Sequence, residues 1–543
     1  MVDAPQDPST TQPPAAPQAA PPFEPVGQPA TSSPPSESPS SPPGPPLPSV
    51  SESPPEPFPS PPTTDTTEPP FPIKVADTPK AKPEPSPSPP PPSSPPSPPP
   101  EPGEPAKTVE PIFKRFLPLI IGLAALTLLA FLIIKVILPK FQKSKEPANI
   151  TLKYWGLWEP ESLMAEIIED YKVSNSHITI QYTRQSPKDY RERLQSALAR
   201  GDGPDILRWH NTWLPMLKND LSPVPATTYS PSDFGTIFYP IVKQDAFSNN
   251  NYYGVPLEFD ALALYINEDI FEQDSTLKVP TTWDNLRQTA FKLKQIDPNT
   301  KQLTRGGVAL GTTSNVDHFS DILGLMILQN GGDPGKPDET AVTSAMKFYT
   351  LFATQDGSWN DDLPNSTQAF ATNKVAMMLA PSWRAIEINQ LNPQLSFKLY
   401  PVPQLPGTNI AWATYWLEGV SKKSANSQAA WDFIKYLSTQ EVLTKMYSQA
   451  SQTRLFGEPY PRQDMASSLQ LDPYVGAIIS QAISAQSYPL VSRTLDNGLN
   501  DRLIKYYKDA INSYHQNLAQ QNITEALSQG VNQVLSQYGL TSQ

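Results

Sequence analysis

The sequence predicts an α/β protein with two lobes, preceded by one apolar helix and a long proline-rich segment. Three observations support this organisation. Residues 1–112 hold 42 of the chain's 68 prolines. An uncharged, apolar stretch follows at 116–134. From residue 150 to residue 543, strand-like and helix-like patterns alternate, which is typical of α/β proteins.

The proline-rich segment 1–112 is expected to be a disordered, semi-extended tail. Proline fixes φ and lacks a backbone donor, so the local preference is polyproline II. Apolar residues are too few here to offset the entropy cost of ordering. The alternative function is a docking site for proline-recognising domains, because PxxP spacings abound. The segment carries a net charge of −9 out of −12 for the whole chain, so the remainder is nearly balanced.

The apolar stretch 116–134 is predicted to span a membrane as a helix, within a segment 113–138 that includes its flanks. It has nineteen residues without a charge, and Thr127 is its only polar side chain. A helix of this length is roughly 28 Å long, close to the thickness of a bilayer's hydrocarbon core. The polar linker 139–149 would keep the folded part near the membrane surface.

Composition excludes several classes of function. The chain has no cysteine, which rules out disulfides, thiol catalysis, thiolate metal sites and a lipid-modified cysteine anchor. Four histidines leave little room for a histidine-based metal site. No basic stripe occurs, so nucleic acid is not an expected partner. GxSxG, P-loop and HExxH motifs are absent as well, and no cofactor is expected.

Strand and helix patterns alternate at the start of the folded part, 150–543. Alternating β-rich residues predict strands, and apolar residues at helical spacing predict helices. In order, the segments are ITLKYWGLW (150–158), ESLMAEIIEDYKVS (161–174), HITIQYTR (177–184), SPKDYRERLQSALARGDG (186–203) and PDILRW (204–209). Strand–helix–strand repeats imply right-handed crossovers and a parallel sheet. About 390 residues exceed the usual size of one core, so two lobes are expected.

Seven sequence stretches of the folded part, taken in order, are similar to those of a known family. They are GDGPDILRWHNTWLPML (201–217), YYGVPLEFDALALYINEDIF (252–271), VPTTWDNL (279–286), LQNGGD (328–333), FATNKVAMMLAPSW (370–383), SKKSANSQAAWDFIKYLSTQE (421–441) and ITEALSQGVNQVL (523–535). As an ordered set, they resemble bacterial extracellular solute-binding proteins of the maltose-binding type, the receptors that feed ABC importers. Two features depart from the family. The family's usual anchor is a lipidated cysteine or a cleaved signal peptide, whereas this chain has a predicted membrane-spanning helix. A long proline-rich tail before that helix is also atypical.

The resemblance implies a periplasmic-binding-protein-like fold, in which crossing strands join two α/β lobes and the ligand lies in the cleft between them. The first lobe would comprise about 150–260 and 412–470, and the second about 262–410 and 471–543. Family members bind sugars and similar solutes and close by a hinge motion. The implied function is a membrane-anchored, extracytoplasmic receptor for a sugar or related polyol. Its partners would be ABC permease subunits and the lipid bilayer, with the tail in the cytoplasm.

Two strand ends supply the first candidate ligand-binding residues. Trp158 and Glu159 follow the first strand, and Trp209 and His210 follow the third. Ligands of open α/β sheets bind at the carboxyl ends of strands, and aromatic faces suit the apolar faces of sugar rings. Inter-lobe packing is the alternative for Trp158, and capping of the next helix is the alternative for His210. Trp213, within that helix, is expected in the core.

Two acids in VPLEFDALAL form the next candidate group. Glu258 and Asp260 are two residues apart, so an extended segment places them on one side. The resemblance puts this segment at the hinge, where one acid would accept hydrogen bonds from ligand hydroxyls; an inter-lobe ion pair is the alternative. Arg454, in SQTRLF, would pair with one of these acids or bind an anionic ligand. Tyr265 and Asn267 match a pair that is structural in the family.

Trp383 and Arg384 are the candidates in the second lobe and follow AMMLAPS, a predicted strand with a proline turn. The resemblance makes Trp383 the aromatic platform of that lobe, with packing beneath the turn as its alternative. Tyr415 and Trp416 match the second crossing segment, where one would face the cleft and the other would pack behind it. Trp283 is expected in the core.

Three functions are compatible with these residues. The leading one is a solute receptor that does no chemistry. A ligand-sensing subunit for a partner membrane protein is the second, because the fixed tether and the tail suit it. A glycoside hydrolase using Glu159, Glu258 or Asp260 is disfavoured, because the ordered motifs have no hydrolase counterpart.

The charges beside the apolar stretch bear on its orientation in the membrane. Three cations precede the stretch and four follow it. By a margin of one charge, this favours the orientation opposite to that of a receptor.

Overall fold

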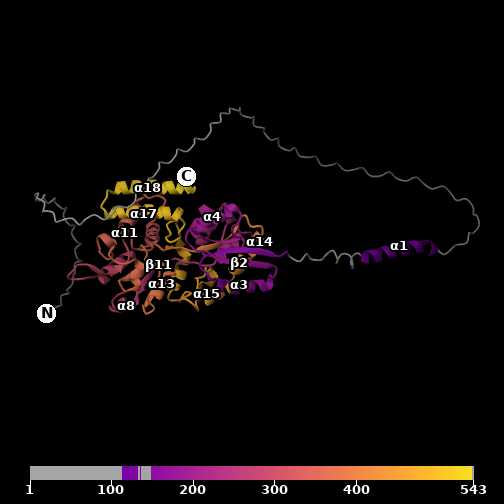
Figure 1. The fold of residues 1–543 in the computed structure, drawn as a ribbon, viewed down its shortest axis with the longest axis horizontal. Coiled ribbons are helices and arrows are strands. Elements are labelled where there is room, and N and C mark those ends of the chain that lie inside the picture. The colour runs from indigo at the N-terminus through magenta and orange to yellow at the C-terminus, as the bar shows by residue number, and fades with distance from the viewer. Residues whose placement is uncertain (1–112, 133–134, 136–147, 541–543) are drawn as a thin grey trace, which may run out of the picture. The chain divides into compact units, whose positions relative to one another are not determined.

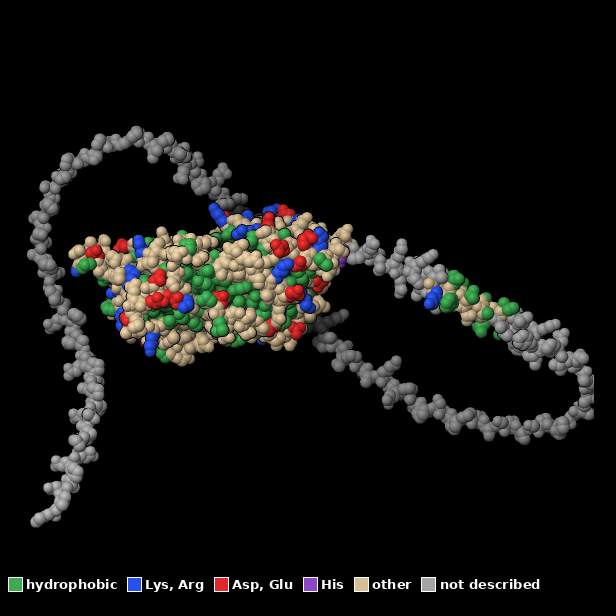
Figure 2. Space-filling view, turned by 90° about the horizontal axis from the view of Figure 1, so that it is seen from below, with side chains coloured by type: hydrophobic (Ala, Val, Ile, Leu, Met, Phe, Trp, Pro, Cys, Tyr) green, Lys and Arg blue, Asp and Glu red, His purple; other side chains and the backbone are tan. Residues whose placement is uncertain are grey.

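The structure, a computed structural model, describes residues 113–132, 135 and 148–540 (Figure 1). The predicted tail, 1–112, lies outside the described residues, as does most of the predicted linker, 139–149. Lysine and arginine are interspersed with aspartate and glutamate on the face that Figure 2 shows. This face therefore has no field of a single sign.

Helix α1, Phe113–Leu132, covers most of the apolar stretch predicted to span a membrane. Apolar side chains are exposed along it, among them Leu119, Ile121 and Leu123 (Figure 2). Within the described residues, no helix combines the length and the apolarity that a bilayer crossing requires. The membrane span stays a prediction, and part of it, 133–134, lies outside the described residues.

The first sheet has the strand order β2-β1-β3-β14-β4, with β7 paired to β14. β1 is parallel to β2 and to β3, as the strand–helix repeats predict, whereas β14 is antiparallel to β3. Its strands are β1 (Ile150–Gly156), β2 (Ile178–Arg184), β3 (Ile206–His210), β4 (Leu221–Ser222), β7 (Val255–Pro256) and β14 (Trp416–Ser421).

Helices α3, Glu161–Ser174, and α4, Tyr190–Arg200, connect the first three strands. On α4 the buried residues are Tyr190, Leu194, Ala197 and Leu198. Gly201 ends α4 with φ at 87°, a left-handed conformation that glycine adopts without steric cost.

The second sheet has the strand order β12-β8-β11-β10-β9. β10 and β11 are parallel, and β8 runs antiparallel to β11 and β12. Its strands are β8 (Leu262–Asn267), β9 (Gln295–Ile296), β10 (Leu303–Val308), β11 (Val375–Pro381) and β12 (Phe397–Tyr400). The fully buried β8 contains Tyr265 and Asn267, as expected for structural residues.

The remaining elements surround these sheets. Helices α17 and α18 lie side by side, and α17 packs against α11 (Figure 1). The elements are η2 (Asn211–Trp213), α5 (Leu214–Leu217), α6 (Pro231–Ile237), α7 (Ile241–Ala246), β5 (Phe247–Ser248), β6 (Asn251–Tyr252), α8 (Glu268–Phe271), α9 (Trp283–Leu293), α10 (Phe319–Gln329), α11 (Thr340–Thr354), α12 (Ser366–Ala371), α13 (Arg384–Leu391), β13 (Ala411–Trp412), α14 (Ser427–Leu437), α15 (Gln440–Ala450), η3 (Gln463–Ser468), α16 (Gly476–Gln481), η4 (Ala482–Ser484), β15 (Ala485–Gln486), α17 (Leu499–His515) and α18 (Gln520–Gln537).

Two crossing segments, 257–261 and 413–415, join the sheets, and they lie beside one another. Ala261 and Ala413 form an antiparallel bridge, and the Thr414 N–H donates to the Asp260 carbonyl at 2.9 Å. Each sheet forms the centre of one lobe, so the two-lobed α/β fold that the sequence predicts is present. The residue ranges expected for the two lobes stay a prediction.

Candidate functional site

A cavity of ≈ 240 Å³, which we call the aromatic cavity, lies between the lobes where the crossing segments meet the two sheets. Residues of both lobes and of both crossing segments form its wall. They are Trp158, His210, Glu258, Asp260, His318, Pro381, Trp383, Thr414, Trp416, Arg454, Glu458, Ser492, Arg493 and Thr494. Most residues predicted to bind ligand are therefore brought together here.

The first lobe contributes two indole rings to the aromatic cavity. Trp158 follows β1, and its ring meets that of Trp416 edge-on, with centroids 5.5 Å apart. The rings of His210 and Trp213 also contact Trp416, at 5.0 and 5.2 Å. Trp213 is buried as expected, so it supports Trp416 from behind. This packing fixes the ring of Trp416, while Trp158 and Trp416 keep part of their surface exposed.

The second lobe contributes Trp383, which immediately precedes α13. It is the most exposed tryptophan of the described residues, at 37%. The guanidinium of Arg384 lies 4.3 Å from its ring centroid, and the His318 ring meets it edge-on at 5.6 Å. Both neighbours hold the ring in place and leave the rest of its surface accessible.

The Asp260 carboxylate holds the turn that carries Trp383. It accepts hydrogen bonds from Ser382 N and Oγ, both at 3.0 Å, and from Trp383 N at 3.4 Å. It also accepts one from Ala261 N at 2.7 Å. Burial raises the pKa of Asp260 to about 7, although these donated hydrogen bonds oppose the rise. Asp260 therefore ties the first crossing segment to the start of α13.

Glu258 and Glu458 form a carboxyl pair beside the cavity. Burial, together with the negative charge of Glu458, raises the pKa of Glu258 well above its ordinary value. Burial also opposes ionisation of Glu458, but Arg454, whose Nη2 lies 2.7 Å from Glu458 Oε1, keeps the pKa of Glu458 below its ordinary value. The two carboxyls share a hydrogen bond, so the proton resides on Glu258 and the charge on Glu458.

Two uncharged histidines complete the polar lining. Burial lowers the pKa of His210 to about 3. Its Nδ1 lies 2.8 Å from Thr212 Oγ1, and its ring caps η2. His210 therefore caps the next helix, as the alternative interpretation predicts, and also lines the cavity. Burial also lowers the pKa of His318. Arg384 Nε donates to His318 Nε2 at 3.0 Å, which leaves Nδ1 to donate to Ser492 Oγ at 2.8 Å.

Trp209 and Tyr415, both predicted as candidates, do not line the aromatic cavity. Trp209 is fully buried, because Gly254 and Gly419 leave room for its indole. A Cβ at Gly254 would lie 2.7 Å from that ring. Tyr415 is 1% exposed and its hydroxyl donates to Asp245 Oδ2 at 2.8 Å, so it packs behind the crossing segment while Trp416 lines the cavity.

Glu159 and Arg384 are also absent from the wall of the aromatic cavity. Glu159 accepts from Arg208 Nη1 at 2.7 and 2.9 Å, and Arg208 Nε also donates to Glu418 at 2.6 Å. This buried ion triad directs the Glu159 carboxylate into the first lobe. Arg384 is 6% exposed and contacts His318, Glu387 and the Trp383 ring, so it acts as a support.

Several wall residues had not been predicted from the sequence. They are His318, Pro381, Thr414, Glu458 and the segment 492–494. Glu458 could have been found from its i,i+4 spacing to Arg454. The segment has no pattern of its own, and its backbone is unusual, because Arg493 and the nearby Leu495 and Asn497 have φ of 64°, 51° and 47°.

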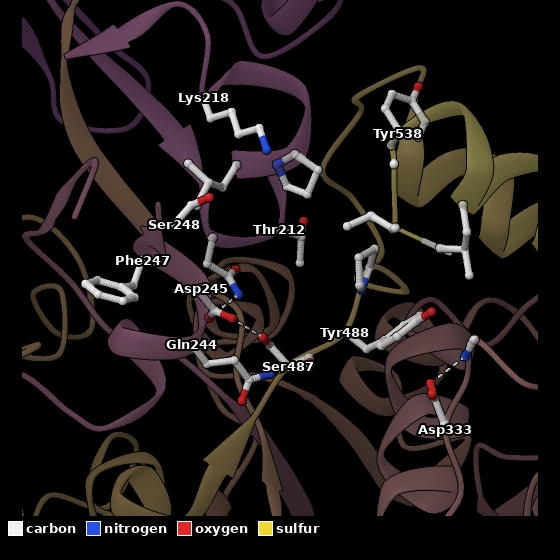
Figure 3. Close-up of a pocket in the computed structure, with 18 of the residues that line it drawn as sticks. Thr212, Lys218, Gln244, Asp245, Phe247, Ser248, Asp333, Ser487, Tyr488 and Tyr538 are labelled. Carbon is white, nitrogen blue, oxygen red and sulfur yellow. Dashed lines mark hydrogen bonds between the residues drawn. The ribbon is translucent and has the colours of Figure 1, made fainter. Parts of the chain in front are cut away.

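A second cavity of ≈ 590 Å³, which we call the large cavity, also has walls from both lobes (Figure 3). Figure 3 shows Asp245 and Ser487 pointing toward each other, with Asp333 across the cavity beside Tyr488. Asp245 accepts from Asn211 Nδ2 at 2.8 Å, from the Tyr415 hydroxyl and from Ser487. Burial raises the pKa of Asp245 to about 6. None of the predicted ligand-binding residues lines this cavity.

No group of three or more potential metal-ligating side chains occurs within the described part of the chain. In the aromatic cavity, three indole rings supply apolar faces, neutral imidazoles and hydroxyls supply hydrogen bonds, and a carboxylate lies beside an arginine.

Comparisons with known proteins also indicate a binding protein. The family model for bacterial extracellular solute-binding protein matches residues 158–443. A putative binding protein of Brucella abortus is 22% identical over 278 residues, covering 50% of this chain and 67% of that protein. The maltotriose-binding protein of Pyrococcus abyssi is 20% identical over 302 residues, covering 54% of this chain and 63% of that protein.

Solved structures share the fold. The sugar-binding protein MalE of Xanthomonas citri has a TM-score of 0.58 at 19% identity, covering 71% of this chain and 98% of that one. A solute-binding protein of Thermotoga lettingae, bound to α-D-tagatose, has a TM-score of 0.56 at 20% identity, covering 71% and 99%. At these identities the likeness concerns the fold alone.

Proposed function

The chain belongs to the bacterial extracellular solute-binding protein family, and on that premise we propose that it is a receptor that binds a carbohydrate in the aromatic cavity for ABC-type import. The receptor does no chemistry; it binds, closes and releases. The names of similar proteins support the ligand class, because they include sugar-binding and maltotriose-binding proteins.

The observation that carries the proposal is the convergence of indole rings from both lobes on one cavity. Trp158 and Trp416 come from the first lobe, and Trp383 comes from the second. A sugar ring has apolar C–H faces and a polar rim, so it suits aromatic walls above and below with hydrogen-bonding groups between them. The Glu458 carboxylate and the carbonyl oxygen of the protonated Glu258, both as acceptors, would serve that rim.

The acids of the cavity argue against glycoside hydrolysis. Hydrolysis needs two carboxyls that flank one bond at a separation of about 5–9.5 Å. Glu258 and Glu458 share a hydrogen bond, which is too close, and Asp260 already accepts from four donors. Glu159 is held by Arg208 away from the cavity.

A thermal-shift screen of the purified chain against sugars and polyols tests the proposed ligand class. A ligand at 100 times its Kd stabilises the protein by about 2.7 kcal/mol. We expect at least one sugar to give a clear shift, which Trp383→Ala abolishes with little change in the Tm of the free protein. Phe291→Ala, which removes another exposed aromatic ring, is the matched control. A panel without any shift would contradict the proposal.

We further propose that the apolar stretch 116–134 anchors the receptor in the membrane, with the folded part outside the cell and the proline-rich tail inside. Its nineteen uncharged residues support the anchor, and a receptor for import must face the solute. Protease treatment of intact cells tests the orientation. We expect loss of the folded part and protection of the tail; the reverse pattern would contradict the receptor function.

A further inference from the structure

A side pocket of ≈ 230 Å³ lies within the first lobe, between the start of α3 and helix α15, next to the aromatic cavity. Five aliphatic or thioether side chains contribute to its wall. They are Leu163, Leu257, Leu443, Met446 and Ala450. The wall of the aromatic cavity, by contrast, has no aliphatic side chain other than Pro381.

Two of the charged residues at the side pocket contact other groups of the protein. Both oxygens of Glu159 accept from Arg208. Arg184 is exposed, and its Nε donates to the Leu157 carbonyl at 3.2 Å. A ligand group that packs on the aliphatic part of the wall would therefore meet apolar surface. An apolar hollow of this kind favours an apolar occupant.

Three side chains form the wall that the side pocket shares with the aromatic cavity: Trp158, Arg454 and Glu458. Trp158 thus presents its indole to both spaces. Arg454 Nη2 is paired with Glu458, but its buried Nε has no hydrogen-bond partner among the described residues. This arginine therefore marks the junction of a polar and an apolar space.

The volumes fit two compact groups. The aromatic cavity, at ≈ 240 Å³, has room for one sugar ring. The side pocket, at ≈ 230 Å³, exceeds the cavity of about 150 Å³ that is known to hold benzene. An aryl or short alkyl group therefore fits beside a single sugar ring.

We infer that the ligand is a glycoside: its sugar ring lies in the aromatic cavity and its apolar substituent lies in the side pocket. This inference rests on the proposed function, because it extends the same carbohydrate site. It names the substrate class as sugars that carry a compact apolar group.

Calorimetric titration of the full chain with matched pairs of methyl and phenyl glycosides tests the inference. The pairs are the α- and β-anomers of glucosides, galactosides and mannosides. For the sugar that binds, we expect the phenyl glycoside to bind at least tenfold more tightly than the methyl glycoside, since burial gains about fourfold in affinity for each methylene-sized group. Equal affinities would overturn the inference while the proposed function stands.

A variant that fills the side pocket shows whether the higher affinity for the phenyl glycoside arises there. Ala450 is half-buried at the end of α15, so Ala450→Leu would occupy the side pocket. We expect this variant to bind the methyl glycoside as the wild type does, which also reports that it is folded, and to lose the phenyl gain. Ala165→Leu, on the exposed face of α3 and outside the pocket, is the matched control and should change neither affinity.

Two further results would count against the inference. A phenyl gain that survives in Ala450→Leu would place the apolar group elsewhere. A disaccharide that binds the wild type as tightly as the phenyl glycoside does would show that the side pocket takes a second sugar ring. If no free sugar and no glycoside of either series binds, the carbohydrate function itself fails, and the inference fails with it.

Discussion

The aromatic cavity and the large cavity both have walls from the two lobes, but they differ in size and in chemistry. The large cavity has more than twice the volume, ≈ 590 against ≈ 240 Å³. Three indole rings line the smaller one and none lines the larger. Volume alone would favour the large cavity, whereas convergence of aromatic faces and hydrogen-bonding groups favours the smaller cavity, which is the proposed site.

An aspartate near the crossing segments lines each cavity, and the contacts of the two aspartates differ as the cavities do. Asp260 accepts from the turn that carries Trp383, so it positions a ligand-facing ring. Asp245 accepts from Asn211, Tyr415 and Ser487, which join parts of the protein frame. Asp260 is buried and Asp245 is half-buried, and we expect their replacement to have different consequences for binding.

Replacing each aspartate by alanine should give the largest effects. We expect Asp260→Ala to lower the free energy of unfolding by about 2–4 kcal/mol, because it leaves buried donors unpaired. The same change should lower sugar affinity about 100-fold, because the Trp383 turn loses its anchor.

Asp245→Ala should lower stability by a similar amount, for the same reason, while changing sugar affinity less than threefold. Denaturant titration and calorimetry of both variants provide the two numbers. If Asp245→Ala lost binding as fully as Asp260→Ala, the functional separation of the cavities would be wrong.

Truncation of one aromatic ring in each cavity is the next strongest test. Trp158→Ala should weaken sugar binding by about 1.5–3 kcal/mol, roughly 10- to 150-fold, through the loss of a stacking face. Tyr488→Ala, in the large cavity, should leave the affinity unchanged. Calorimetric titration with the same sugar measures both, and equal losses would contradict the assignment.

The two cavities should also titrate in different pH windows. The pKa of Asp245 is raised to about 6 and that of Asp260 to about 7. Because the folded state then holds protons that the unfolded state has released, each group's stabilisation is complete below pH about 4. It is lost as pH rises toward about 6 for Asp245 and toward about 7 for Asp260.

Tm measured from pH 4 to 8 reports these losses. Asp245→Asn should remove the part of the slope below pH about 6, and Asp260→Asn the part that extends to about 7, each worth about 1–3 kcal/mol. A bound sugar should alter only the Asp260 part. Profiles that match the wild type in both variants would show that neither aspartate titrates in this way.

Ser487→Ala should give the smallest effect. The Ser487 hydroxyl donates one hydrogen bond to Asp245, and two other donors remain. We expect a loss of about 1 kcal/mol in the free energy of unfolding and less than a threefold change in sugar affinity. Chemical denaturation measures the first quantity. A large change in affinity would mean that the large cavity takes part in binding.

Local patterns in the sequence predicted much of the fold. The β1–α3–β2–α4–β3 alternation was found at nearly the observed boundaries, because strand and helix periodicities are local. Trp158, His210, Trp383 and Trp416 line the cavity because strand ends and turns carry them there. Their role in binding stays a prediction.

What could not be predicted depends on residues far apart in the sequence. Trp209 is buried because Gly254 and Gly419 make room for its ring. Glu159 is turned inward by Arg208, 49 residues away, which Glu418 also binds. The segment 492–494 enters the wall through tertiary contacts, such as that of Ser492 with His318, and not through any pattern of its own.

A crystal structure with the tightest-binding sugar of the screen tests the central claim most directly. The account predicts a sugar ring in the aromatic cavity, in contact with Trp383 at about 4 Å and with at least one of Trp158 and Trp416. A sugar found in the large cavity, with the aromatic cavity free of ligand, would contradict it.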